Sequence, residues 1–173
     1  MRKLITFYSR PGNNYVNGDI VNLPVGNTEV AANMIHKLTD SDIFRIDTLK
    51  AYPEDYHETT EVAKQELREN VRPELSGHID NMADYDVIYL GYPNWWGTMP
   101  MAVFTFLEAY DFAGKILFPF CTHEGSGMGR SESDIEKLCA GAKLLKGLAI
   151  RGGTIHEAQE VIGDWLRNLG EIV

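Results

Sequence analysis

The chain has 173 residues, of which 44% are hydrophobic and 24% are charged, and its formal net charge is −9. This size and balance are typical of one globular domain over residues 1–173, and they exclude a largely disordered or membrane-spanning chain. The dispersed basic residues and the negative net charge argue against nucleic acid as a partner, because binding a polyphosphate requires a basic patch.

The cysteines, the histidines and the first residues indicate the cellular setting. Cys121 and Cys139 lack Cys-x-x-Cys spacing, which suits a reducing compartment and argues against a disulfide framework. The five histidines are scattered without the spacing of metal ligands, so we expect no metal. The first apolar stretch is short and has no small-residue cleavage site behind it, and we therefore expect a cytoplasmic protein.

Short apolar runs alternate with helical patterns along the chain. An apolar strand is predicted at residues 2–9, and apolar residues follow helical spacing from Asn27 onward. The later strands are expected at 42–47, 86–91, 116–121 and 144–150, and the later helices at 53–70, 101–110, 131–139 and 154–169. This alternation predicts an α/β three-layer sandwich in which a five-stranded parallel sheet carries helices on both faces.

Two features interrupt this pattern. The connection from Arg10 to Gly26, a long insertion at 11–26 after the first strand, is unusual in a compact domain and is expected to be functional. Pro119 falls within the fourth predicted strand, although proline cannot donate to a sheet ladder. We expect Pro119 to mark the end of the ladder or a bulge.

Polar residues gather where the first strand precedes the first helix. Ser9 and Arg10 end the strand, and Asn27 and Thr28 open the helix. A helix N-terminus offers free N–H groups and a partial positive charge, and these side chains could complete an anion site. The alternative is that Asn27 or Thr28 is an ordinary helix cap. The loop lacks Gly-x-Gly-x-x-Gly and Gly-Lys-Ser/Thr, which argues against a dinucleotide fold and a nucleotide triphosphatase.

Two adjacent tryptophans, Trp95 and Trp96, follow the third predicted strand. Open parallel sheets bind ligands outside the carboxyl ends of their strands, and indole rings at such an edge suit a flat aromatic ligand. The alternative is that both rings only fill the interior.

A glycine-rich segment, residues 121–130, follows the fourth predicted strand. Its three glycines at 125, 127 and 129 let the backbone approach a ligand closely, although a flexible surface turn has the same composition. Cys121 and His123 lie two residues apart on an extended segment, so their side chains point to opposite faces and a thiol enzyme is not expected.

These three loops follow the first, third and fourth strands. In a sheet ordered 2-1-3-4-5 those strands are neighbours around the topological switch point, where such sheets bind ligands. The three signals therefore converge on one crevice.

The chain resembles the flavodoxin family over essentially its whole length. The likeness is to bacterial short-chain flavodoxin-like proteins with a Pro-x-Trp-Trp-Gly-Thr-x-Pro loop and a Phe-Cys-Thr-His-x-Gly-Ser-Gly loop, here 93–100 and 120–127. The resemblance implies a flavodoxin-like fold and non-covalent FMN, with the chemistry on the flavin and no catalytic side chain. It places the phosphate on Ser9, Arg10, Asn27 and Thr28, and the ring system on Pro93, Asn94, Trp95, Trp96, Gly97, Thr122, His123, Gly125 and Ser126.

The chain departs from the family pattern at two places. The usual phosphate loop follows the first strand within a few residues, whereas sixteen residues separate Arg10 from Asn27 here. Residues 11–25 are expected to form a flap near the flavin or a contact with a second subunit, with Asn13, Asn14 and Tyr15 replacing missing phosphate contacts. Many electron-carrier flavodoxins also place a tyrosine after the fourth strand, but residues 122–129 contain no aromatic ring except the His123 imidazole. One flavin face is therefore expected to be open.

The resemblance implies electron transfer through FMN at a low potential, since an acidic surface disfavours adding negative charge to the flavin. The alternatives are an NAD(P)H-dependent FMN or quinone oxidoreductase and a flavin-free module that binds a partner or hydrolyses a substrate. The corresponding partners are a redox protein, or NAD(P)H and a quinone, and the protein is expected to be a monomer or a homodimer.

Overall fold

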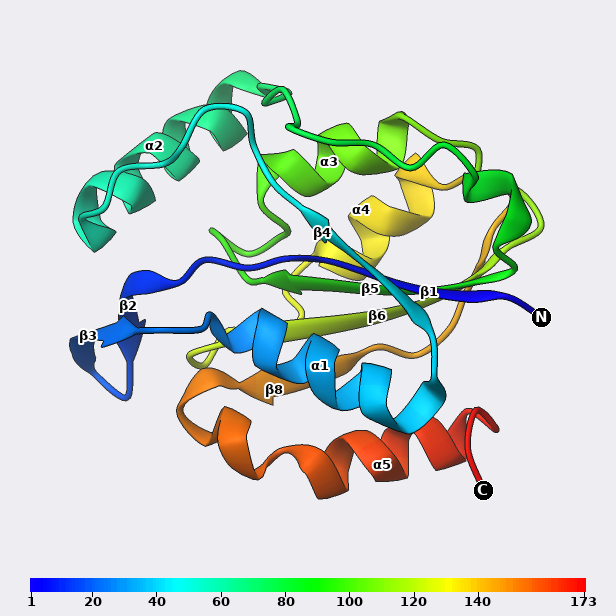
Figure 1. Cartoon of the computed structure of the whole chain (residues 1–173). Helices are drawn as coiled ribbons and strands as arrows, with labels where there is room; N and C mark the ends of the chain where they lie inside the picture. Colours follow the sequence, from blue (N-terminus) through cyan, green and yellow to red (C-terminus); the bar gives the residue numbers. More distant parts are fainter.

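The computed structural model, which describes all 173 residues, places one sheet between two layers of helices (Figure 1). The sheet consists of β1 (Lys3–Tyr8), β4 (Asp42–Ile46), β5 (Val87–Pro93), β6 (Ile116–His123), β7 (Lys143–Leu144) and β8 (Leu148–Arg151). The strand order is β4-β1-β5-β6-β7, and β8 also pairs with β6. All pairs in this sheet are parallel. The predicted 2-1-3-4-5 order is confirmed, with two short strands sharing the fifth position.

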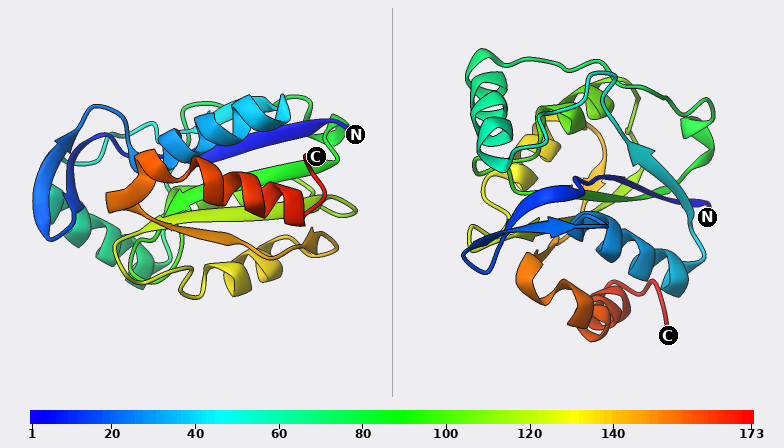
Figure 2. Two further views of the ribbon diagram at one scale, coloured as in Figure 1. Left: turned by 90° about the horizontal axis from the view of Figure 1, so that it is seen from below. Right: turned by 60° about the vertical axis from the view of Figure 1, so that its left-hand side comes forward.

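Helices cover both faces of the sheet, as the sequence predicts. The helices are α1 (Asn27–Thr39), α2 (Tyr56–Glu69), α3 (Met101–Glu108), α4 (Ser131–Leu138) and α5 (Gln159–Asn168), with short 3₁₀ segments η1 (Met82–Asp84) and η2 (Gly152–Glu157). α1 and α5 lie on one face, and α2, α3 and α4 lie on the other (Figures 1 and 2). None of the helices has both the length and the apolar character that crossing a bilayer requires.

The alternation of side chains along the central strands builds the two cores. On β5, Ile88 and Leu90 join the core beneath α3 and α4, whereas Val87 and Tyr89 join the core beneath α1 and α5. All four side chains are buried. A strand buried on both faces reads as a continuous apolar run, which is why this strand was predictable.

The last third of the chain differs from its predicted elements. The strand expected at 144–150 is broken into β7 and β8, and the closing helix expected at 154–169 starts as the 3₁₀ segment η2. Pro119 faces the break. On one side of it, the Leu117 carbonyl accepts a hydrogen bond from the Leu145 N–H, and on the other side the pairing of β6 with β8 begins at Phe120. The missing N–H of Pro119 therefore coincides with an interruption of the ladder on this side of β6.

The insertion folds as an antiparallel hairpin of β2 (Gly12–Val16) and β3 (Asp19–Leu23). Its turn is Asn17-Gly18, and both residues have positive φ (52° and 88°). This is the turn chemistry that two-residue hairpins prefer. The hairpin lies at the end of the sheet, beyond the start of α1 (Figures 1 and 2).

Gly91 on β5 provides a test of the packing between the central strands. A β-carbon at this position would collide with the ring of Phe120 on β6, which is fully buried. We expect Gly91→Ala to lower the free energy of unfolding by about 1–3 kcal/mol, the usual cost of overpacking a core. Urea denaturation measures the loss. Gly77→Ala is the matched control, because its new β-carbon would make only an ordinary contact with Phe44. Equal unfolding midpoints for the two variants would contradict this account of the core.

Candidate functional site

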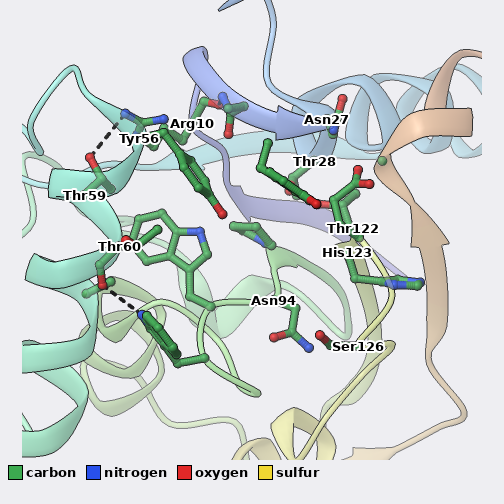
Figure 3. A pocket seen from close by; sticks show the side chains of 18 of the residues that line it. Arg10, Asn27, Thr28, Tyr56, Thr59, Thr60, Asn94, Thr122, His123 and Ser126 are labelled. Atoms are coloured by element: carbon green, nitrogen blue, oxygen red, sulfur yellow. Dashed lines mark hydrogen bonds between the residues drawn. The ribbon is translucent and has the colours of Figure 1, made fainter. Parts of the chain in front are cut away.

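A cleft of about 680 Å³ opens at the carboxyl ends of β1, β5 and β6. This volume is in the range of small-molecule sites. All the predicted site residues except Gly125 line it, as do Asn14 and Tyr15 of the expected flap but not Asn13. The other lining residues are Tyr56, Thr59, Thr60, Ala63, Glu124 and Gly152. Figure 3 shows Tyr56, Thr59 and Thr60 on one side, with Asn27, Thr28, Thr122 and His123 on the other. The three predicted loops therefore meet at one place.

Ser9 caps helix α1 from outside the helix. Its Oγ accepts a hydrogen bond from the Glu29 N–H (3.1 Å), and the N-cap residue Gly26 contributes no side-chain cap. A β-carbon on Gly26 would collide with the Ser9 hydroxyl, so this approach requires glycine. Neither Asn27 nor Thr28 is the cap, which corrects the alternative considered from the sequence. The first N–H groups of a helix have no intrahelical acceptor, and those of Asn27 and Thr28 remain for a ligand.

Three further hydrogen bonds fix this end of the cleft. Arg45 donates to the Ser9 carbonyl (2.8 Å) and to the Glu29 carboxylate (2.7 Å), which joins β4 to the start of α1. The buried hydroxyls of Thr28 and Thr122 lie 2.8 Å apart and share a hydrogen bond.

Arg10 lies at the edge of the cleft, but its guanidinium bonds to other parts of the chain. It donates to the carbonyls of Pro53 (3.0 Å) and Glu54 (2.9 Å), to Thr59 Oγ1 (3.2 Å) and to the Asn13 carbonyl. Burial lowers the pKa of this guanidinium from its ordinary value. Arg10 therefore joins the hairpin to the start of α2, and none of these contacts involves the α1 N-terminus.

The two tryptophans have different environments. Trp95 packs edge-on against Tyr8 and Tyr52, with centroid distances of 5.3 and 5.2 Å. Trp96 has a φ of 56° and is 46% exposed, and its indole N–H donates to the Thr60 carbonyl of α2 (2.9 Å). Positive φ in a bulky residue is strained, and such strain concentrates at functional turns. Trp95 is thus a packed part of the cleft lining, and Trp96 attaches the tryptophan loop to α2.

Asn94 holds the tryptophan loop against the glycine-rich loop. Its backbone N–H donates to the Thr122 carbonyl (2.8 Å), and its amide Nδ2 donates to the Gly127 carbonyl (2.8 Å). Its Oδ1 accepts from the Gly97 N–H (2.9 Å), which closes the turn. One side chain therefore sets the separation of the two loops.

His123 and Cys121 occupy contrasting positions on β6. His123 Nδ1 accepts from the Gly125 N–H (2.9 Å), and partial burial followed by the nearby Arg151 lowers the pKa of this imidazole. Cys121 is fully buried, and burial raises the pKa of its thiol to about 12. Nucleophilic cysteines require a thiolate, so this thiol is not suited to catalysis.

Sequence reasoning missed the wall contributed by α2, whereas the hairpin lies where the flap of residues 11–25 was expected, with Asn14 and Tyr15 lining the cleft. Tyr15 stacks on Tyr56 with a centroid distance of 6.0 Å and an interplanar angle of 24°. The Asn17-Gly18 pair, with short apolar runs on either side, was a hairpin signal in the sequence. The positions of Tyr56, Thr59 and Thr60 had no such signal, because they depend on where α2 packs.

Comparison with known proteins identifies the family. The sequence model of the flavodoxin family matches residues 21–169. The chain belongs to the flavodoxin family. A search of curated protein sequences gives no match. Among solved structures, this flavodoxin-family chain is similar to a candidate flavoprotein from Bacteroides eggerthii, with 23% identity, coverage of 98% of both chains and a TM-score of 0.78.

Two other solved structures are also similar. A candidate flavoprotein from Bacteroides uniformis has 26% identity and a TM-score of 0.75, covering 96% of this chain and 97% of its own. A flavoprotein from Lactobacillus acidophilus, solved in complex with FMN, has 19% identity and a TM-score of 0.63, covering 92% and 98%.

The lowered pKa of His123 predicts a pH dependence of stability. Between its pKa in the folded protein and its pKa in the unfolded chain, this imidazole binds fewer protons in the folded state. The free energy of unfolding therefore falls as the pH drops below about 6.5, the ordinary histidine pKa, toward the lower pKa of the folded state. We expect wild type to lose slightly more stability than His123→Asn over this interval, as measured by urea unfolding between about pH 7.5 and 5. His156→Asn, at an exposed position, controls for the substitution itself. Identical pH profiles for wild type and His123→Asn would contradict the assignment.

Proposed function

We propose that the chain is an FMN-binding redox protein that transfers electrons through non-covalently bound FMN. The observation that carries this proposal is the position of an open helix N-terminus and a tryptophan loop across one cleft. One end of the cleft suits a phosphate and the other suits a flat ring. Membership of the flavodoxin family and the FMN complex of the Lactobacillus acidophilus relative support the same cofactor.

The phosphate end of the cleft fits an anion. The backbone N–H groups of Asn27 and Thr28 and the Asn27 amide would hold the phosphate, and the helix dipole favours its charge. Ser9 already satisfies the next N–H, so its role there is to shape the helix end. Arg10, whose contacts lie elsewhere, contributes positive charge at the edge of the cleft.

The ring end of the cleft is bounded by residues 93–97 and 122–127, which Asn94 holds together. Trp95 or Trp96 would contact the ring, and backbone groups of both loops would meet its polar edges. Bound FMN supplies reversible acceptance of electrons, and the protein supplies position and electrostatic environment. The net charge of −9 disfavours further negative charge on the cofactor and suits a basic protein partner.

A second candidate function is an NAD(P)H-dependent oxidoreductase with a quinone or flavin acceptor. The observation that favours it is the absence of an aromatic side chain other than His123 in residues 122–129, which leaves room for a small flat substrate beside the ring. Electron carriage remains the first candidate, because a carrier needs only an accessible flavin edge.

The phosphate site is tested by the substitution Asn27→Ala. We expect the affinity for FMN to fall by about tenfold, close to the loss of one charge-assisted hydrogen bond, while riboflavin binds as it does to wild type. Quenching of flavin fluorescence measures both affinities. Riboflavin is the matched control because it lacks only the phosphate, and an equal loss for both ligands would exclude a phosphate contact at Asn27.

The function itself is tested by the visible spectrum after incubation with FMN and desalting, followed by anaerobic addition of NADPH. Retained flavin bands are expected, and the carrier proposal predicts slow or absent bleaching by NADPH alone. Rapid bleaching followed by steady turnover with a quinone would select the oxidoreductase. A colourless protein that takes up no FMN would overturn the proposal and favour a flavin-free module.

A further inference from the structure

We infer that the β2–β3 hairpin is a strap across the phosphate end of the cleft that restricts the cofactor to a flavin mononucleotide and excludes the dinucleotide FAD. This inference rests on the proposed function, because it concerns the ligand of the same cleft. The strap is defined as residues 12–23, which join the wall formed by α2 to the opposite wall formed by Glu124 and η2.

The base of the strap is fixed to α2. Arg10 bonds to the carbonyls of Pro53 and Glu54 and to Thr59 Oγ1, as described above. Asn13 Oδ1 accepts a hydrogen bond from the backbone N–H of Tyr56 (2.7 Å), and Tyr56 is the first residue of α2. These contacts satisfy donors and acceptors that would otherwise be left at the start of a helix, so the base of the strap is part of the folded structure.

The middle of the strap contributes to the cleft lining. Asn14 and Tyr15 face the same cavity as Asn27 and Thr28. Tyr15 stacks on Tyr56, and Asn14 Nδ2 donates to the Arg10 carbonyl (2.8 Å). The strap therefore bounds the cleft near the α1 N-terminus.

The tip of the strap reaches the opposite wall. The Asn17 N–H donates to Glu124 Oε2 (3.2 Å). The Asn17 carboxamide packs against Gly153, where a β-carbon would collide with it. The strap is thus held on both walls, and its tip contact joins two residues, Asn17 and Glu124, that are 107 positions apart in the sequence.

The exclusion of FAD follows from the position of the strap. FAD continues from the same phosphate through a second phosphate to an adenosine, and that extension needs an exit at the end of the cleft that the strap covers. Asn14 and Tyr15 of the strap line this end of the cleft, and the tip is held on Glu124, so the strap occupies the space through which the extension would leave.

The inference is tested by shortening the strap. Asn14 and Val21 are paired in the β2–β3 ladder, so residues 15–20 can be replaced by a two-residue Asn-Gly turn that removes Tyr15 and the tip and preserves the base. We expect the ratio of FMN affinity to FAD affinity to fall by at least about tenfold, and FMN to dissociate faster. Flavin fluorescence titration and stopped-flow release measure these quantities, and circular dichroism reports folding.

A pair of point variants addresses the tip alone. Gly153→Ala places a methyl group against the Asn17 carboxamide and should displace the tip, giving a smaller change in the same direction. Adding Asn17→Gly removes the colliding group, retains the N–H that bonds to Glu124, and should restore the wild-type ratio. Asn17→Gly alone is the control, and this series decides the question if the shortened protein fails to fold.

The two proposals fail in different ways. Wild type that binds no FMN would overturn the proposed function. A second outcome would overturn the inference about the strap and leave the proposed function intact. In that outcome wild type binds FMN, but neither the shortened strap nor the Gly153→Ala series changes the ratio of FMN affinity to FAD affinity or the rate of FMN release.

Discussion

The close approach of the end of β1 to the start of α1 is the constraint on which the site depends. Ser9 caps α1 across a gap in which Gly26 has no side chain, and a β-carbon there would also press on the Arg10 backbone. The two ends of the sixteen-residue insertion therefore meet, as they would if the insertion were absent. Because the ends are fixed by the fold, the hairpin can project over the cleft without altering the helix N-terminus beneath it.

The sheet order and the three converging loops could be predicted from the sequence, and the details that follow from packing could not. Val87 to Leu90 is apolar because both faces of β5 are buried, and that pattern is local. The break between β7 and β8 depends on how Gly147 packs against Pro119 of a different strand, which no local pattern records. The Asn17-Gly18 pair is a local turn signal, but the contact of this turn with Glu124 joins residues far apart in the chain.

The paired tryptophans show how one short motif serves two physical purposes. Trp95 sits edge-on between Tyr8 and Tyr52, an arrangement that suits the ring quadrupoles and leaves little freedom to move. Trp96 accepts a strained backbone so that its indole can reach α2, where Lys64 also lies over the ring at 5.3 Å. The position of α2 is therefore set from two sides, by Arg10 at its start and by Trp96 near its middle.

The divided fifth strand has a consequence for association between copies of this protein. An uninterrupted outer strand presents a row of unpaired backbone groups that another chain can extend into a longer sheet. Here β7 has two residues and β8 has four, with the break opposite Pro119 between them. This side of the sheet offers no continuous template, so the protein is protected there against strand addition and the aggregation that follows from it.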